Sequence, residues 1–249
     1  MNNKVVLITG GSRGIGAATA ILAAKKGWNV CISYNSREAE ANSVVKQIEQ
    51  YGKTALAIQA NVGVEQDIVS LFKDIDTKFG RLDALVNNAG IITPQTQFAD
   101  MDASRILNVF NINVVGSFLC AREAIKRMSS KRGGHGGTIT NLSSAAARIG
   151  SPNEFIDYAA SKGAIDTMTL GLSKEVADDG IRVNAVRPGL IETDMHADAG
   201  DINRPDKLKN HIPLKRAGKV DEVANAVVWL MSDEASYVNG TLLDVAGGR

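Results

Sequence analysis

Residues 4–16 read KVVLITGGSRGIG, and this stretch decides the fold. Residues 4–9 are apolar at nearly every position, which predicts a parallel strand buried on both faces. A helical pattern over 14–26 begins inside the glycine cluster that follows, Gly10, Gly11, Gly14 and Gly16. Glycine tolerates the positive φ of a tight turn, and its missing Cβ lets the backbone approach an anion. The stretch therefore predicts a strand, a phosphate-cradling loop and a helix whose N-terminus faces the phosphate.

Strand-like and helical patterns alternate along the rest of the chain. Further strands are predicted over 29–34, 54–59, 82–86, 138–142, 182–186 and 241–245. Further helices are predicted over 37–50, 65–79, 103–128, 156–176 and 220–231. This alternation predicts an α/β fold, a parallel sheet with helices on both faces, in a single domain over 1–249. Residues 188–213 have weak periodicity and are predicted to be a lid within that domain.

The overall composition limits which classes of binding partner we expect. The 249 residues carry 28 Lys plus Arg against 27 Asp plus Glu, so no global field favours a nucleic acid or an anionic membrane. The N-terminus lacks a secretion signal, and no uninterrupted apolar run approaches the roughly 18 residues of a membrane span. Cys31 and Cys120 are predicted to be buried free thiols. We expect a cytoplasmic protein without a metal site, because its three histidines are scattered.

The end of the second strand bears on the choice of nucleotide. Sites for NAD usually place Asp or Glu there to hold the adenosine ribose hydroxyls, whereas this strand runs into Asn35, Ser36 and Arg37. Arg37 and Arg13 suit a ribose 2′-phosphate, so we expect NADP(H), with NAD(H) as an alternative. Arg37 also fits an ordinary solvated helix start. The loop lacks the Lys-Ser/Thr ending of a P-loop, but it does not exclude an adenosyl methyltransferase.

Tyr158 and Lys162 are four residues apart in a predicted helix, so their side chains lie on neighbouring turns of one face. A cation at about 4 Å favours phenolate by about 4 kcal/mol, which lowers a tyrosine pKa by up to about three units. We therefore expect Lys162 to make Tyr158 a usable proton shuttle. The buried stripe of this helix is predicted at Ala160, Ala164, Met168, Leu172 and Val176. The spacing alone also occurs by chance in many helices.

Three further polar residues are candidates. Ser143 and Ser144 follow the predicted strand 138–142, where a hydroxyl can hydrogen-bond a substrate oxygen or cap a turn. Asn113 lies on an otherwise mainly apolar helix stripe, and a buried amide must be paired. It can support a water or carbonyl near Lys162, or satisfy a helix irregularity.

Taken in order, these motifs resemble those of the short-chain dehydrogenase/reductase family over nearly the whole chain. The landmarks are Thr9-Gly10-x-x-x-Gly14-x-Gly16, Asn87-Asn88-Ala89-Gly90, Asn113, Ser144, Tyr158-x-x-x-Lys162 and Pro188-Gly189. The resemblance implies one Rossmann-like, doubly wound domain with a seven-stranded parallel sheet. One departure concerns Ser144, which precedes Tyr158 by one residue more than in many relatives. We expect the extra residue to loop out within 151–154, with Ser143 as a weaker alternative.

The resemblance also implies roles for particular residues. Tyr158 would exchange the substrate proton, Ser144 would position the substrate oxygen, Lys162 would bind the nicotinamide ribose, and Asn113 would support a proton-relay water. The implied cofactor-binding residues are Gly10, Ser12, Arg13, Gly14, Ile15, Gly16, Asn35, Ser36, Arg37, Asn61, Val62, Asn88, Ala89, Gly90, Tyr158, Lys162, Pro188, Gly189, Ile191 and Thr193. Many relatives have Asp where Asn61 stands, so that adenine contact can differ.

The expected function is reversible hydride transfer between NADP(H) and a carbonyl or secondary alcohol. The resemblance permits small-molecule ketones, sugars and acyl-thioester substrates such as 3-oxoacyl-carrier-protein, and implies a homotetramer, with a dimer as alternative. Apolar surface on 220–231 and 241–245 suits such an assembly. The alternative function is a redox sensor or scaffold that binds NADP without catalysis, although such a protein has no need of the Tyr158 and Lys162 pair.

Overall fold

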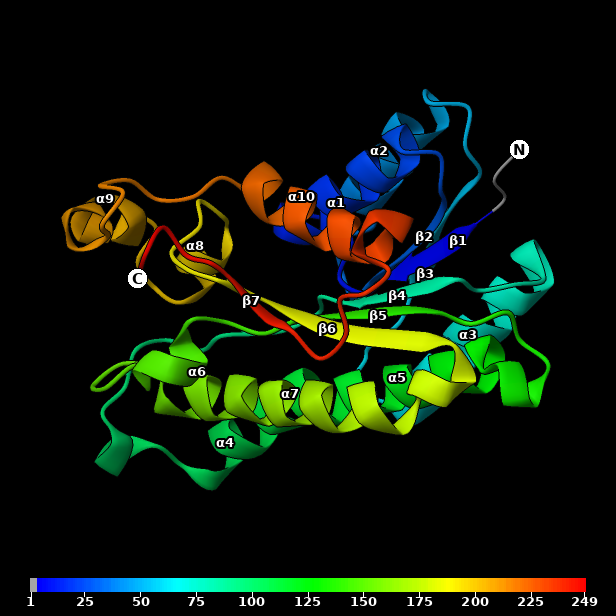
Figure 1. Ribbon diagram of the computed structural model, residues 1–249. Coiled ribbons are helices and arrows are strands. Elements are labelled where there is room, and N and C mark those ends of the chain that lie inside the picture. The colour runs from blue at the N-terminus through cyan, green and yellow to red at the C-terminus, as the bar shows by residue number, and fades with distance from the viewer. Residues whose placement is uncertain (1–3) are drawn as a thin grey trace.

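The computed structural model describes residues 4–249, and its strands form one parallel sheet in the order β3-β2-β1-β4-β5-β6-β7 (Figure 1). The strands are β1 Val5–Ile8, β2 Asn29–Tyr34, β3 Ala55–Gln59, β4 Ala84–Asn87, β5 Gly137–Leu142, β6 Ile181–Pro188 and β7 Leu242–Val245. The predicted α/β class and seven-stranded parallel sheet are confirmed. Because the strands are parallel, their carboxyl ends share one edge of the sheet.

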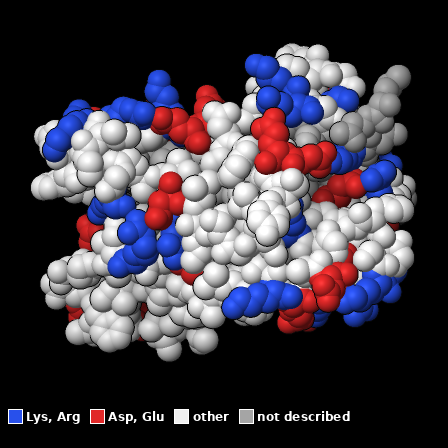
Figure 2. All heavy atoms as spheres, in the orientation of Figure 1, with Lys and Arg blue, Asp and Glu red and all other residues white. Residues whose placement is uncertain are grey.

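Helices cover both faces of the sheet (Figure 1). The longer helices are α1 Gly14–Lys25, α2 Glu38–Glu49, α3 Glu65–Phe79, α4 Ala103–Phe110, α5 Gly116–Met128, α7 Ile156–Glu175 and α10 Val220–Met231. Helices α1, α2 and α10 lie on one face, and α3, α5 and α7 lie on the other. Figure 2 shows positive and negative side chains mixed over the visible surface.

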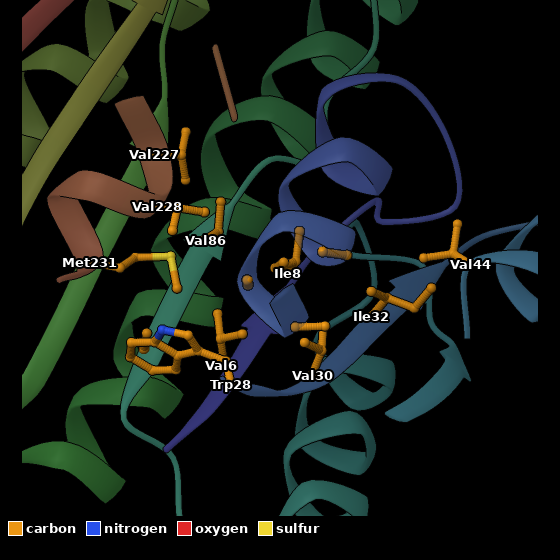
Figure 3. Close-up of a cluster of buried hydrophobic side chains, with 14 of the residues drawn as sticks. Val6, Ile8, Trp28, Val30, Ile32, Val44, Val86, Val227, Val228 and Met231 are labelled. Carbon is orange, nitrogen blue, oxygen red and sulfur yellow. The ribbon is translucent and has the colours of Figure 1, made fainter. Parts of the chain in front are cut away.

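Strand β1 shows why residues 4–9 are apolar throughout. Val6 and Ile8 belong to the core beneath α1 and α10, while Val5 and Leu7 belong to the core on the opposite face. In Figure 3, side chains of α10, among them Met231, gather beside the sheet residues of the first of these cores. Full burial of such a side chain stabilises the fold by about 1.5–3 kcal/mol, so each apolar residue of β1 contributes to one core or the other.

The buried stripe predicted for α7 is right at Met168 and Val176 and wrong at Ala160. Ala160 is exposed, and the residues buried on this helix include Ser161, Lys162, Ile165 and Thr169. A helix turns once every 3.6 residues, so a repeat of four drifts by about 40° at each step and leaves the buried face. The buried face of the helix therefore includes Lys162 together with other polar residues, in addition to apolar ones.

The predicted helix 103–128 is continuous but irregular. A π-helical turn, Asn111–Val115, joins α4 to α5 and contains the buried Asn113. By length and mean hydropathy, the stretch Ala103–Met128 is one that could cross a membrane. It packs against α7 and β4, however, and it contains Arg105 in an ion pair. We therefore interpret it as a surface helix of the domain whose outer face is apolar.

The 188–213 segment contains more structure than its weak periodicity predicts. It forms α8 Met195–Asp198, α9 Arg204–Leu208 and a short 3-10 turn, Lys209–His211. A parallel bridge between Ile191 and Gly218 anchors its start. Arg204 also pairs with Glu154, near the small helix α6 Ala146–Ile149. The segment therefore lies along the carboxyl edge of the sheet.

Candidate active site

A cleft of about 340 Å³ opens at the carboxyl edge of the sheet, where the loops after β1, β2, β4, β5 and β6 meet. Nearly all the predicted site residues line it: Gly10, Ser12, Arg13, Gly14, Ile15, Asn35, Ser36, Arg37, Asn61, Val62, Asn88, Ala89, Gly90, Ser144, Tyr158, Lys162, Pro188, Gly189, Ile191 and Thr193. Two do not. Gly16 and Asn113 lie behind the cleft wall, in contact with residues that line it.

The glycine loop fits a phosphate by its geometry. Gly10 and Gly14 have φ values of +64° and +56°, and a Cβ on Gly10 would lie 3.0 Å from the Cα of Ala89. Helix α1 begins at Gly14, and within the described residues no side chain caps it and no acid occupies its first turn. Its N-terminal N–H groups therefore remain available to an anion in the cleft.

Gly16 serves the packing of that loop. A Cβ there would lie 2.5 Å from the Gly10 carbonyl oxygen and 2.5 Å from Nδ2 of Asn88. The same Asn88 amide donates to the carbonyl oxygens of Thr9, at 2.8 Å, and Gly10, at 3.0 Å. Gly16 thus lets α1 sit close enough for the loop after β4 to clamp the loop after β1.

The two predicted cations differ in their surroundings. Arg37 lies at the start of α2, is about half exposed and pairs with Glu40 at 3.1 Å. Arg13 reaches the 188–213 segment, where it pairs with Asp198 and lies 3.8 Å from Asp194. Its Nη1 is buried and has no hydrogen-bond partner within residues 4–249. One guanidinium nitrogen therefore still needs an acceptor, as expected of a group that lines an anion site.

Tyr158 and Lys162 converge on the cleft from one face of α7. The Lys162 Nζ lies 5.6 Å from the centre of the Tyr158 ring and donates to the Leu142 carbonyl oxygen at 2.7 Å. An ammonium group has three N–H donors, so others remain for a ligand. A Cβ placed on Gly90 would lie 3.6 Å from that Nζ, which places the loop after β4 directly beside the amine.

The structure distinguishes the two serines after β5. The Ser143 hydroxyl donates to the Lys162 carbonyl oxygen of α7 at 3.1 Å, so its hydrogen is already used. The Ser144 hydroxyl accepts the N–H of Ala146 at 3.1 Å, so its own hydrogen points elsewhere, and its interaction with the Tyr158 phenol lowers the pKa of that phenol. Ser144 is therefore the serine whose hydroxyl can serve a ligand together with Tyr158.

Asn113 connects three elements from inside the π-turn. Its Oδ1 accepts the N–H of Ile91 at 2.8 Å, and its Nδ2 donates to the Ile91 carbonyl oxygen at 3.0 Å and to the Ser161 hydroxyl at 3.1 Å. Its own carbonyl oxygen accepts from the Ser117 hydroxyl at 2.9 Å. The side chain therefore positions Ile91, which lines the cleft, relative to α7.

Comparisons with known proteins agree with this geometry. A family profile described as enoyl-(acyl carrier protein) reductase matches residues 10–249. The chain is 53% identical over 245 residues to the uncharacterised oxidoreductase YgfF of Escherichia coli, covering 98% of this chain and 99% of that one. It is 38% identical to the 3-oxoacyl-[acyl-carrier-protein] reductase FabG of Staphylococcus aureus, covering 98% and 97%. The chain belongs to the short-chain dehydrogenase/reductase family.

A solved member of this family has the same fold. The short-chain dehydrogenase from Burkholderia cenocepacia, determined in complex with NADP, superposes with a TM-score of 0.90 at 34% identity and covers 98% of this chain and 97% of that one. Because the chain belongs to this family, it is an oxidoreductase. The glycine loop is therefore not that of a methyltransferase.

The turn predicted to hold the extra residue between Ser144 and Tyr158 has an unusual backbone. Gly150, Ser151 and Asn153 have φ values of +77°, +45° and +63°. Residues with a Cβ rarely adopt such values, and they are typical of a tight turn in the backbone. The turn ends before Phe155, and α7 then begins at Ile156 with Tyr158 in its first helical turn.

The pKa of Tyr158 departs in the direction opposite to our expectation. Burial raises the pKa of the phenol above its usual value of 10, and the hydrogen bond to Ser144 opposes this rise only in part. The predicted lowering by Lys162 is therefore wrong for the protein chain itself. Burial of the phenol is the reason, because removal from water disfavours the charged phenolate. Burial also lowers the pKa of Lys162, to about 8.

Several residues that line the cleft were not predicted: Ser33, Tyr34, Ala60, Ile91, Ile112, Leu142, Asp194, Met195 and His196. Most of them lie next to a predicted residue in the sequence, so extending each motif by one or two positions would have found them. His196 is different. Its Nε2 lies 2.7 Å from the carbonyl oxygen of Ile191, and burial lowers the pKa of the imidazole. No sequence pattern indicates this contact, since it depends on how α8 folds back.

The low pKa of Lys162 predicts a pH-dependent stability. In the unfolded chain a lysine titrates near 10.4, so between about pH 8 and pH 10.4 the unfolded state binds more protons and stability rises with pH. We expect the free energy of unfolding of the wild type to rise relative to Lys162→Met by up to about 3 kcal/mol over that window. Urea unfolding at pH 7.5 and pH 10 measures this, and equal changes in both proteins would contradict it.

Proposed function

We propose that this chain is an NADP(H)-preferring dehydrogenase or reductase that interconverts a carbonyl group and a secondary alcohol, with Tyr158 as the proton donor and acceptor. The observation that carries the proposal is the convergence of Tyr158, Ser144 and Lys162 on one cleft whose other end is the N-terminus of α1. One end suits a pyrophosphate, and the other suits a reacting oxygen.

The chain's own residues handle the oxygen and its proton. When bound, the nicotinamide supplies or accepts the hydride. During carbonyl reduction, the Tyr158 O–H donates its proton to the substrate oxygen while the Ser144 O–H stabilises the charge that develops there. Lys162, held by the Leu142 carbonyl, has donors left for the hydroxyls of a ribose.

The preference for NADP is supported by the end of β2. Asn35, Ser36 and Arg37 line the cleft there, and no Asp or Glu of this loop lines it among residues 4–249. Arg13, with its unpartnered Nη1, lies across from them. Two guanidinium groups in the cleft, and no carboxylate from the loop after β2 in place to hold free ribose hydroxyls, favour a 2′-phosphate.

Substitution of Arg37 tests this preference. A hydrogen bond to a charged group contributes about 1.5–3 kcal/mol, so Arg37→Ala should lower kcat/KM for NADPH by about tenfold to a hundredfold. The value for NADH should change little. Steady-state kinetics with both cofactors measures the ratio, and Lys46→Ala on the same helix α2 is the control. An unchanged NADPH-to-NADH ratio in Arg37→Ala would remove Arg37 from the site.

A substrate panel tests the reaction class. Oxidation of NADPH and NADH should be followed with acetoacetyl and crotonyl thioesters, a vicinal diketone and a steroid ketone, and reduction of NADP and NAD with glucose. The proposal predicts turnover of at least one carbonyl or alcohol. Turnover of the crotonyl thioester alone would indicate reduction of a C=C bond instead. Cofactor binding without turnover across the panel would favour the sensor or scaffold alternative.

We also propose a cytoplasmic homotetramer. Exposed apolar side chains support an assembly: Leu107, Val115 and Phe118 on the 103–128 helix, Leu170 on α7 and Trp229 on α10. Exposed apolar surface of this kind commonly marks an interface between subunits. Sedimentation equilibrium of the purified chain measures its mass in solution, and a monomeric mass would exclude the assembly.

A further inference from the structure

Arg105 of α4 and Asp157 of α7 form an ion pair directly beside Tyr158. The Arg105 Nε lies 2.8 Å from Oδ2 of Asp157, and its Nη2 lies 3.4 Å from Oδ1. The Asp157 side chain is 1% exposed and that of Arg105 is 13% exposed. The two residues are 52 positions apart, so the pair joins two elements that only the fold brings together.

Asp157 also holds the beginning of the catalytic helix. Its Oδ1 accepts the backbone N–H of Tyr158 at 2.9 Å. This N–H belongs to the first turn of α7 and has no partner within the helix. The Thr93 hydroxyl lies 3.5 Å from the other carboxylate oxygen. Asp157 therefore determines where the main chain of Tyr158 lies relative to the loop after β4.

Arg105 holds that loop from the other side. Its Nη1 donates to the Pro94 carbonyl oxygen at 2.6 Å and to the Thr96 hydroxyl at 3.0 Å. The backbone N–H of Thr96 in turn donates to the carbonyl oxygen of Glu154, at 3.2 Å. The loop of residues 91–96 begins at Ile91, which lines the cleft. One guanidinium thus fixes this loop and the carboxylate beside Tyr158 together.

Stability alone does not account for such a pair. Desolvation of two buried charges roughly offsets their attraction, so an apolar pair of similar volume often stabilises a protein as well or better. What the ion pair adds is direction, because a planar guanidinium can satisfy a carboxylate, a carbonyl and a hydroxyl at fixed angles. Proton transfer to a bound carbonyl needs that precision, since a displacement of about 1 Å can cost about a hundredfold in rate.

We propose that Arg105 and Asp157 are positioning residues that hold Tyr158 and the 91–96 loop in register across the substrate end of the cleft. The inference rests on the proposed function, in which the Tyr158 hydroxyl exchanges the substrate proton. Neither residue is among those that line the cleft, so each acts through its neighbours.

The opposite edge of the sheet contains a matched control. Asp83, just before β4, accepts the backbone N–H of Val5 at 2.8 Å and the Nε of Arg81 at 2.8 Å. Like Asp157, it is a carboxylate with little exposure that pairs with arginine and accepts a main-chain N–H. It lies at the amino end of the strands, away from the cleft. Loss of this pair should therefore affect stability without affecting the proton step.

The experiment compares four variants with the wild type: Arg105→Lys, Arg105→Met, the double variant Arg105→Met/Asp157→Asn, and the control double variant Arg81→Met/Asp83→Asn. Kinetics use NADPH with acetoacetyl thioester, or with the diketone if the wild type reduces it faster. We expect kcat to fall about tenfold to a hundredfold in all three Arg105 variants, with the NADPH dissociation constant unchanged. The control should keep its kcat.

Hydrogen exchange of the cofactor-free protein supplies a readout that is independent of turnover. The backbone amides of Thr96 and Tyr158 should exchange faster in Arg105→Met and in the Arg105/Asp157 double variant, but not in the Arg81/Asp83 control. Arg105→Lys retains the charge and keeps the test possible if Arg105→Met does not fold, because a single ammonium cannot reproduce the guanidinium's contacts at their fixed angles.

Three outcomes would overturn the inference. They are a normal kcat in the double variant, a fall in kcat equal to that of the Arg81/Asp83 control, and unchanged exchange at Thr96 and Tyr158. A wild type that is inactive on the whole panel, or a fully active Tyr158→Phe, would instead overturn the proposed function. If the wild type is active, Tyr158→Phe is inactive and the Arg105/Asp157 double variant is active, only the proposed positioning role of Arg105 and Asp157 would be wrong.

Discussion

Tyr158→Phe should lower kcat by about 10²–10⁴-fold, the contribution usual for a positioned general acid or base. The substitution removes only the phenolic O–H, so the ring keeps its place beside the Lys162 amine, which lies 5.6 Å from the ring centre. Fold and cofactor affinity should therefore be preserved. Single-turnover oxidation of NADPH with the best carbonyl of the panel measures the effect, and fluorescence titration measures NADPH binding.

The matched control for this variant is Tyr51→Phe, which removes an O–H from a tyrosine that is exposed and does not line the cleft. It should retain wild-type kinetics. If Tyr158→Phe retained near-normal turnover, the proton would have to come from another group, and Ser144 would be the next candidate because its hydroxyl lies beside the phenol. The proposed proton role of Tyr158 would then be wrong.

Gly16→Ala should lower the affinity for NADPH by about a hundredfold, although Gly16 does not line the cleft. The added methyl group would lie 2.5 Å from the Gly10 carbonyl oxygen and from the Asn88 amide. The carbonyl belongs to the main chain, so relief requires movement of the phosphate loop or of α1. Overpacking of this kind costs about 1–3 kcal/mol, and here the displaced atoms form the anion site.

Gly171→Ala in α7 is the control for Gly16→Ala. A Cβ at Gly171 meets nothing within 4 Å. Alanine stabilises a helix interior by up to about 1 kcal/mol relative to glycine, so this variant should be equally or more stable and bind NADPH normally. Calorimetric titration with NADPH measures both affinities. Normal binding by Gly16→Ala would show that the loop and α1 can separate without harm to the site.

Much of the fold follows from local patterns. The strand ends differ from those predicted by at most two residues, because buried parallel strands leave short apolar runs bounded by glycine and polar turns. The residues of the cleft were also predictable in outline, since the carboxyl ends of parallel strands meet at one edge. The glycine loop, Asn88, Ser144 and the Tyr158 and Lys162 pair all follow such strands or face them.

Other properties depend on residues far apart in the chain. The buried face of α7 was predicted correctly only in part, because a spacing of four residues does not match the helical turn. The direction of the Tyr158 pKa was wrong because burial is set by elements that close over the ring, not by its neighbour four residues away. Asn113 was recognised as a buried amide, but its partners Ile91 and Ser161 became known only from the fold.

By itself the sequence determined the order of strands and helices, the glycine-rich loop after the first strand and most of the residues that line the cleft, because glycine geometry and hydrophobic periodicity are local. Only the tertiary structure decided which distant charges meet, such as Arg13 with Asp198, 185 residues away, and Arg105 with Asp157. The same holds for the protonation of buried groups. Solvation and long-range pairing depend on all the elements packed around a side chain, and no single segment of sequence encodes them.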